Sequence, residues 1–145
     1  MTAIFQATLS LRVPWGACDP AGTVHLSHWF RWFDLATWNY FERGGLPLQE
    51  MMQRYGNAGL PLVSVMAELK APARVHEEIA VETCVSAWKR KTLEMQHVFR
   101  RGKTLLLEGS EIRAWVMRDP SRPSGMRAAD VPSAVIDHFR RLAPG

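Results

Sequence analysis

Hydrophobic and polar residues alternate along five segments of the chain, as expected of β-strands with one face buried. The first alternating segment covers residues 4–13 and stops at Pro14. The other four lie beyond residue 60 and cover residues 61–71, 77–89, 92–101 and 104–118. Because these four follow one another closely, we expect them to form a meander, with a hairpin turn at residues 101–103.

Residues 27–43 follow a different pattern, in which apolar positions repeat every three or four residues. Ser27 is the candidate N-cap, and the glycines at 44 and 45 supply a stop signal. The repeating positions include Trp29, Phe33, Ala36 and Tyr40. A helix this apolar cannot face water, so a sheet must wrap it. The pattern therefore predicts an α+β fold with one long central helix wrapped by a five-stranded antiparallel sheet.

Two shorter helices complete the predicted elements. One covers residues 48–55, and the other begins after the Asp-Val-Pro run at 130–132, beyond a polar loop at 119–129. The chain has no internal repeat and no low-complexity linker, so we expect a single domain over residues 1–145. The helix covers only one face of the sheet, and a second copy of the chain is a candidate to cover the rest.

Composition narrows the class of protein. The chain is 47% hydrophobic, which is typical of a globular domain. Its two cysteines, Cys18 and Cys84, lie far apart and have no metal-ligand spacing, so we expect neither a disulfide nor a metal site, and a reducing cytoplasm fits best. The first residues resemble neither a signal peptide nor a membrane span. A net charge of +4 favours an anionic ligand.

Asp19 is the first candidate for chemistry. It opens the run Asp-Pro-Ala-Gly at residues 19–22, which is good turn chemistry, so Asp19 could simply cap a turn. However, this turn lies just before the start of the long apolar helix. Free N–H groups at a helix start can polarise a carbonyl group, and a nearby carboxylate could attack that carbonyl or activate water.

Several stretches of the sequence resemble the 4-hydroxybenzoyl-CoA thioesterase family. The Asp-Pro-Ala-Gly run leading into an aromatic-rich helix is the most specific of them. The resemblance extends over most of residues 9–118 and is carried by residues 13–24, 30–34, 40–47, 60–63, 79–84, 88–92 and 111–114.

This resemblance implies a fold and an activity. The family's fold is the hotdog fold, in which an antiparallel sheet wraps a long helix, and its members form dimers or tetramers with active sites between subunits. It implies hydrolysis of an acyl-CoA thioester to a free acid and CoA, with Asp19 as nucleophile or general base and the backbone N–H of Leu26 polarising the thioester carbonyl. No metal or separate cofactor is implied, because CoA is part of the substrate.

The resemblance also implies binding residues. The acyl group is expected near His25, Ser27, Asp34, Leu60 and Pro61. The phosphates of CoA are expected at Lys89, Arg90 and Lys91, where two predicted strands meet. By composition alone, a run of three basic residues is as often a solvated turn, and Asp34 could equally form an ion pair with a neighbouring strand.

Two departures from the family pattern concern the substrate. Relatives that act on hydroxybenzoyl groups tend to carry Tyr in place of Leu26 and a hydroxyl residue in place of Leu60. A more apolar pocket would suit an unsubstituted aromatic ring or a short to medium aliphatic acyl chain better than a phenol.

Three other functions compete with hydrolysis. A hotdog dehydratase would normally use a catalytic His, and an acyl-CoA-binding protein without turnover would not need Asp19. A nucleic-acid-binding module could use a basic face made of Arg100, Arg101, Lys103, Arg140 and Arg141. No recognition-helix or RNA-binding signature supports the last of these, so we expect neither a nucleic-acid partner nor a membrane partner.

Overall fold

The computed structural model describes residues 4–144. Its elements, in chain order, are β1 (Gln6–Arg12), the 3-10 helix η1 (Trp15–Ala17), α1 (Leu26–Arg43), α2 (Leu48–Tyr55), β2 (Asn57–Gly59), β3 (Leu62–Leu69), β4 (Glu78–Trp88), β5 (Thr92–Arg101), β6 (Thr104–Ala114), β7 (Val116–Arg118), β8 (Met126–Ala128) and α3 (Ser133–Arg141). In the part of the chain that is described, no helix is both long and apolar enough to cross a membrane.

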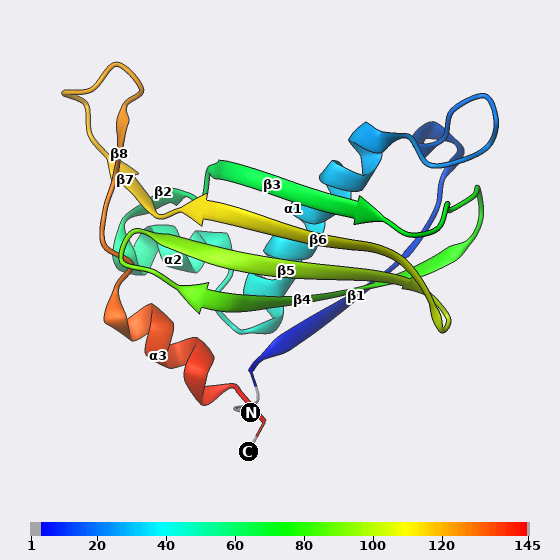
Figure 1. Cartoon of the computed structure of the whole chain (residues 1–145). Coiled ribbons are helices and arrows are strands. Elements are labelled where there is room, and N and C mark those ends of the chain that lie inside the picture. Colours follow the sequence, from blue (N-terminus) through cyan, green and yellow to red (C-terminus); the bar gives the residue numbers. More distant parts are fainter. Residues whose placement is uncertain (1–3, 145) are drawn as a thin grey trace.

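Five strands form one antiparallel sheet in the order β1-β4-β5-β6-β3, and α1 lies across one face of it (Figure 1). The predicted α+β hotdog arrangement is therefore confirmed. Helix α2 lies beside the end of α1, and α3 lies near the end of β4 (Figure 1). A small second sheet in the order β2-β7-β8 extends from one end of the molecule.

The predicted meander is wrong for β3. This strand pairs with β6 at the edge of the sheet, whereas β4, β5 and β6 do follow one another. Residues 70–77 between β3 and β4 run past the end of the sheet, where Arg74 forms a bridge to Thr23. Alternation marks a segment as a strand but carries no information about its neighbour in the sheet, which explains the error.

Three smaller predictions also need correction. The strand predicted at 104–118 is interrupted at Trp115, and β8 lies within the predicted loop 119–129. The N-cap of α1 is His25, whose ring accepts a hydrogen bond from the backbone N–H of Ser27, so Ser27 is inside the helix. Histidine is uncommon at the N-cap position, whereas serine is among the residues preferred there, which is why the sequence pattern indicated Ser27.

The core lies between α1 and the sheet. Trp29, Trp32 and Phe33 on α1 pack against Ile79, Val81, Phe99 and Leu107 on the strands. Further along α1, Tyr40 and Phe41 pack against Phe139 of α3. The helix can approach the sheet closely at one point because β6 carries a glycine there: an added Cβ on Gly109 would lie 2.2 Å from the ring of Phe33.

Replacing Gly109 with Ala should destabilise the protein by about 2 kcal/mol, because the new methyl group would overlap the Phe33 ring. Urea unfolding measures the change. Gly16→Ala is the matched control, since an added Cβ at Gly16 meets nothing within 4 Å, and it should change stability little. Adding Phe33→Leu to Gly109→Ala should recover part of the loss; an additive loss would contradict the proposed contact.

Candidate active site

Asp19 lies in a tight loop that leads directly into α1. The loop is closed by a bridge between Cys18 and Val24, and the backbone N–H of Asp19 donates to the carbonyl of Thr23 at 2.8 Å. The backbone N–H of His25 donates to the carbonyl of Ala17 at 2.8 Å. These bonds hold the loop and the first turn of the helix together as one unit.

Three donors of its own loop hydrogen-bond the carboxylate of Asp19. Oδ1 accepts from the backbone N–H groups of Ala21 (2.9 Å) and Thr23 (3.2 Å), and the Thr23 hydroxyl lies 3.1 Å from Oδ1 and 3.0 Å from Oδ2. The bonds from the backbone and hydroxyl of Thr23 hold the pKa of Asp19 below its usual value. Asp19 is therefore ionised at neutral pH, and it also caps its turn, as the simpler prediction had it.

The start of α1 offers main-chain donors. Leu26 is the first residue of the helix, and its side chain is 63% exposed. Within residues 4–144 its backbone N–H has no hydrogen-bond partner, as expected of the first residue in a helix. The next N–H group, that of Ser27, is capped by the ring of His25 at 3.2 Å. The helix start thus combines a free donor with the positive end of the helix dipole.

A cavity of about 490 Å³ opens between α1 and the start of β3. Its walls are mostly apolar, and one end is charged. The lining residues are Ser27, Phe30, Arg31, Phe33, Asp34, Pro61, Leu62, Val65, Glu111 and Arg113. Three of the predicted acyl-binding residues, Ser27, Asp34 and Pro61, therefore come together here. Leu60 does not line the cavity; its side chain is only 3% exposed and packs in the core beside it.

A buried polar network forms the charged end of the cavity. Glu111 on β6 accepts hydrogen bonds from Thr37 of α1 (3.0 Å) and from Arg113 (2.7 Å), and His97 Nε2 lies 2.6 Å from its Oε1. The other ring nitrogen of His97 lies 2.8 Å from the Thr83 hydroxyl. Burial alone would raise the pKa of Glu111, but the contacts with His97 and Arg113 lower it below its usual value.

The sequence prediction missed this network. Glu111 and Arg113 lie on the face of β6 that packs against α1, in phase with Leu107 and Gly109. Charged residues at the inward positions of an alternating strand indicate a buried polar network, because buried charges require partners.

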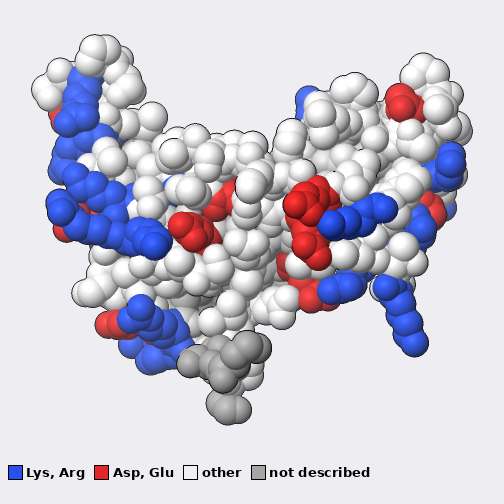
Figure 2. All heavy atoms as spheres, in the orientation of Figure 1, with Lys and Arg blue, Asp and Glu red and all other residues white. Residues whose placement is uncertain are grey.

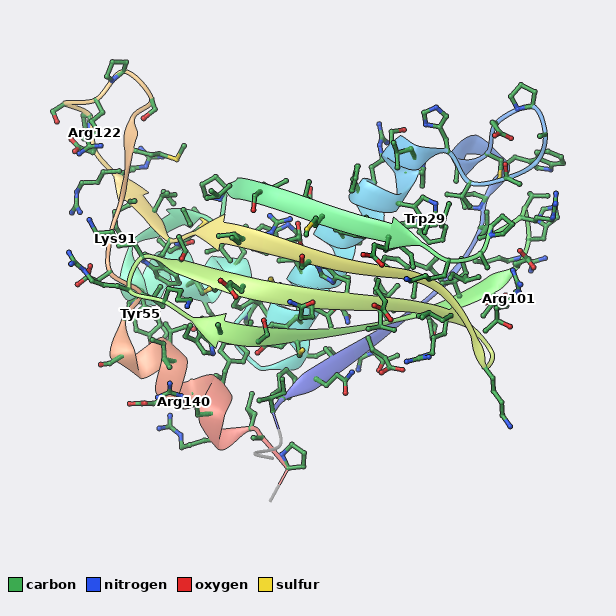
Figure 3. The ribbon with its side chains drawn as sticks, viewed as in Figure 1. Trp29, Tyr55, Lys91, Arg101, Arg122 and Arg140 are labelled. Atoms are coloured by element: carbon green, nitrogen blue, oxygen red, sulfur yellow. The ribbon has the colours of Figure 1, made fainter. Side chains whose placement is uncertain are left out.

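The predicted CoA-binding residues form the turn between β4 and β5. Lys89, Arg90 and Lys91 are exposed, and Arg90 pairs with Asp130 at 3.0 Å. The turn is held by the carbonyls of Arg90 and Lys91, which accept from the N–H groups of Val131 and Trp115. Figure 2 shows basic side chains gathered at this end of the molecule, where Figure 3 places Lys91 and Arg122; Arg101 lies at the opposite end.

The basic turn and Asp19 lie at opposite ends of the sheet within one chain. Arg12, at the end of β1, pairs with Glu78 at the start of β4, and the turn begins after Trp88 at the end of β4. Ten residues of extended strand separate these points, or about 33 Å. Figure 1 shows the loop before α1 and the β4–β5 turn at opposite ends of the sheet. Asp19 is also absent from the described lining of the cavity.

Among the described residues, no three His, Cys, Asp or Glu side chains are grouped so that they could hold a metal ion. His25 and His28, the pair at helical spacing, are engaged locally: His25 with Ser27, and His28 edge-on to Trp32.

This fold is that of the hotdog thioesterases, and comparison with known proteins gives the same class. Residues 13–139 match the family described as the thioesterase-like superfamily. A 4-hydroxybenzoyl-CoA thioesterase of Pseudomonas sp. strain CBS-3 is 35% identical over 137 residues, which span 90% of this chain and 94% of that protein. The chain therefore belongs to the thioesterase-like superfamily, which confirms the predicted family and enzyme class.

Solved structures agree. The structure of the 4-hydroxybenzoyl-CoA thioesterase from Pseudomonas sp. strain CBS-3 superposes with a TM-score of 0.83 and 32% identity, and covers 92% of this chain and 98% of that one. The structure of the gentisyl-coenzyme A thioesterase BH1999 superposes with a TM-score of 0.76 and 25% identity, and the match covers 91% of this chain and 98% of that one.

Glu111→Gln should cost about 3 kcal/mol of stability at neutral pH, because it leaves Arg113 buried without its ionised partner. The pKa of Glu111 is lowered in the folded protein, so its ionised form stabilises the fold above the unfolded value of 4.5, and this stabilisation is lost as the pH falls through the folded pKa. Urea midpoints of wild type and Glu111→Gln should therefore converge below pH 4.5.

Glu108→Gln is the matched control for Glu111→Gln. It lies on the same strand, is exposed, and should leave stability nearly unchanged. An equal gap between wild type and Glu111→Gln at neutral and acidic pH would contradict the stabilising role of the ionised carboxylate.

Proposed function

We propose that this protein hydrolyses acyl-CoA thioesters to a free acid and CoA, with Asp19 as the catalytic carboxylate. The observation that carries this proposal is the position of Asp19: an ionised carboxylate held by hydrogen bonds in the loop that leads directly to the free N–H at the start of α1. The relatives named 4-hydroxybenzoyl-CoA and gentisyl-CoA thioesterase support the reaction class.

In this mechanism the main chain and the carboxylate have separate tasks. The thioester carbonyl lies against the N–H of Leu26, which stabilises the negative charge that develops on its oxygen. In one route Asp19 attacks the carbonyl carbon and expels the thiolate of CoA, and water then hydrolyses the resulting mixed anhydride to the free acid and restores Asp19. In the other route Asp19 removes a proton from a water that attacks the carbonyl, and the thiolate of CoA leaves.

The acyl group occupies the cavity between α1 and β3. Its volume of about 490 Å³ falls within the range of small-molecule sites, which is about 300–1,000 Å³. The aromatic and aliphatic walls at Phe30, Phe33 and Val65 suit an aromatic ring or a short to medium acyl chain. Ser27 lines the cavity from the helix start and Pro61 lines it from the opposite side, while the predicted residues His25 and Leu60 lie next to them in the chain and outside the lining.

The phosphates of CoA bind at Lys89, Arg90 and Lys91. Backbone hydrogen bonds fix this turn, and the three side chains extend from it into solvent. Their contribution is mainly electrostatic, so affinity for CoA should fall as salt concentration rises.

The active protein is a homodimer, or a tetramer built from such dimers, and each site combines residues of two chains. β3 is an edge strand with exposed apolar side chains, namely Leu62, Val63, Met66 and Leu69. The opposite edge strand, β1, exposes Gln6, Thr8 and Ser10 instead. An apolar edge strand is a surface for strand pairing, which a second copy would satisfy.

A shared site also accounts for the separation between Asp19 and the basic turn. A two-fold axis that pairs β3 with its copy reverses the direction of the sheet, and therefore places the basic turn of one chain at the Asp19 end of the other. The cavity borders β3, so the second copy would also close it. We further infer a cytoplasmic location, which the two free cysteines support.

Asp19→Asn should reduce kcat at least a thousandfold on any acyl-CoA that the wild type hydrolyses, because the amide is neither nucleophile nor base. Release of free thiol from benzoyl-, hydroxybenzoyl-, phenylacetyl- and aliphatic acyl-CoAs measures turnover. Binding of the same acyl-CoA should persist in the variant.

Asp119→Asn is the matched control for Asp19→Asn. Asp119 also precedes a proline, caps a turn through the N–H and hydroxyl of Ser121, and has a lowered pKa. Its variant should keep the wild-type kcat. Turnover that survives Asp19→Asn would reject the catalytic role, and no turnover by the wild type on any substrate would favour a binding protein.

Replacing both Val63 and Met66 with Lys should yield single chains of 16.4 kDa that have lost turnover, because the charges block strand pairing at β3. Light scattering after size exclusion gives the mass, and thiol release gives the activity. The control is the double variant Thr8→Lys with Ser10→Lys on β1, which should keep the wild-type mass and the wild-type turnover. A wild type that is active as a single chain would overturn the shared site.

A further inference from the structure

Arg113 connects three walls of the cavity. Its Nη1 donates to the backbone carbonyl of Leu60 at 3.0 Å, and its Nη2 donates to Asp34 Oδ1 at 2.6 Å and to Glu111 Oε2 at 2.7 Å. Leu60 belongs to the segment before β3, Asp34 to α1 and Glu111 to β6. One guanidinium group therefore sets the positions of these three segments relative to each other.

The guanidinium is itself held rigidly from the far side. The side chains of Arg113 and Glu111 are 5% and 1% exposed. Glu111 is in turn held by Thr37 and by His97, whose ring is fixed by Thr83. Arg113 is therefore anchored to Glu111, a buried partner that is itself held by the polar network.

Stability alone is a poor account of this arrangement. Apolar residues of similar volume are often as stable as a buried ion pair, or more so. The Nε of Arg113 is also buried without a hydrogen-bond partner among the described residues, which adds a cost. A buried cation that is incompletely satisfied, yet bound to an exposed carboxylate at the cavity, points to a role at that cavity.

Asp34 is the group on which this arrangement acts. Its side chain is 63% exposed and lines the cavity, so without a partner it would be free to change rotamer. The short contact to Arg113 holds one oxygen and leaves the other available to the cavity. The bond to the Leu60 carbonyl fixes the adjacent Pro61 wall in the same way.

We propose that Arg113 is a positioning residue for acyl recognition, which fixes the Asp34 carboxylate and the Leu60–Pro61 wall around the acyl group without contacting the reacting atoms. This inference rests on the proposed function, since it concerns the cavity assigned to the acyl group. It predicts that Arg113 controls which acyl groups are accepted, while CoA binding depends on the distant basic turn.

The test compares Arg113→Met and Arg113→Lys with wild type on benzoyl-CoA and acetyl-CoA, and measures inhibition by free CoA. In either variant, the kcat/KM for the acyl-CoA that the wild type prefers, divided by the kcat/KM for the other, should fall about tenfold. The fall should come chiefly from a higher KM for the preferred acyl-CoA. The inhibition constant of free CoA should stay unchanged. Lys91→Ala is the reciprocal control: it should weaken inhibition by CoA and keep the acyl preference.

A double-mutant cycle with Asp34→Asn tests whether Arg113 acts through Asp34. Asp34→Asn alone should lower the acyl preference, and adding Arg113→Lys should lower it little further, because both changes remove the same contact. Additive losses, or equal losses on both acyl-CoAs accompanied by altered CoA inhibition, would show that Arg113 is merely structural.

If Arg113→Met fails to fold, Arg113→Lys still tests the proposal. Lysine retains the charge beside Glu111, but a single ammonium group cannot span Leu60, Asp34 and Glu111 as the guanidinium does. A folded Arg113→Lys protein with wild-type acyl preference would overturn the proposal. A wild type that is inactive on every acyl-CoA would instead reject the proposed function.

Discussion

The rest of the structure depends on burial of the aromatic face of α1 against the sheet. The side chains of Trp29, Trp32 and Phe33 are too large and apolar to meet water, so the strands must curve around them. Phe33 approaches β6 so closely that only glycine fits beneath it at position 109. This contact sets the distance between helix and sheet. It also fixes the start of α1, and with it the loop that carries Asp19.

The same packing creates the conditions for a binding site. Where the aromatic face of α1 ends toward β3, charged residues of β6 replace apolar ones, and their partners come from α1 and β5. The cavity therefore has apolar walls and a polar end, as small-molecule sites generally do. The loop that carries Asp19 and the basic turn are attached to opposite ends of this rigid unit, which is why a second copy is central to the proposed function.

Much of this could be predicted from local pattern. Alternation located the long strands, helical spacing located α1 and α2, and the Asp-Pro-Ala-Gly run located the loop of Asp19. Pairing was not predictable in this way: the position of β3 beside β6 and the small sheet of β2, β7 and β8 depend on contacts between distant segments. Arg113 was missed for a similar reason, because its partners Asp34 and Leu60 lie 79 and 53 residues away.

The central claim is that one site combines Asp19 and the cavity of one chain with the basic turn of another. A crystal structure of the Asp19→Asn variant with an intact acyl-CoA tests it most directly. We predict the acyl group in the cavity beside Asp34, the thioester carbonyl at the N–H of Leu26 with residue 19 adjacent, and the phosphates at residues 89–91, with two chains contributing. A thioester bound far from residue 19, or a complete site within one chain, would contradict the account.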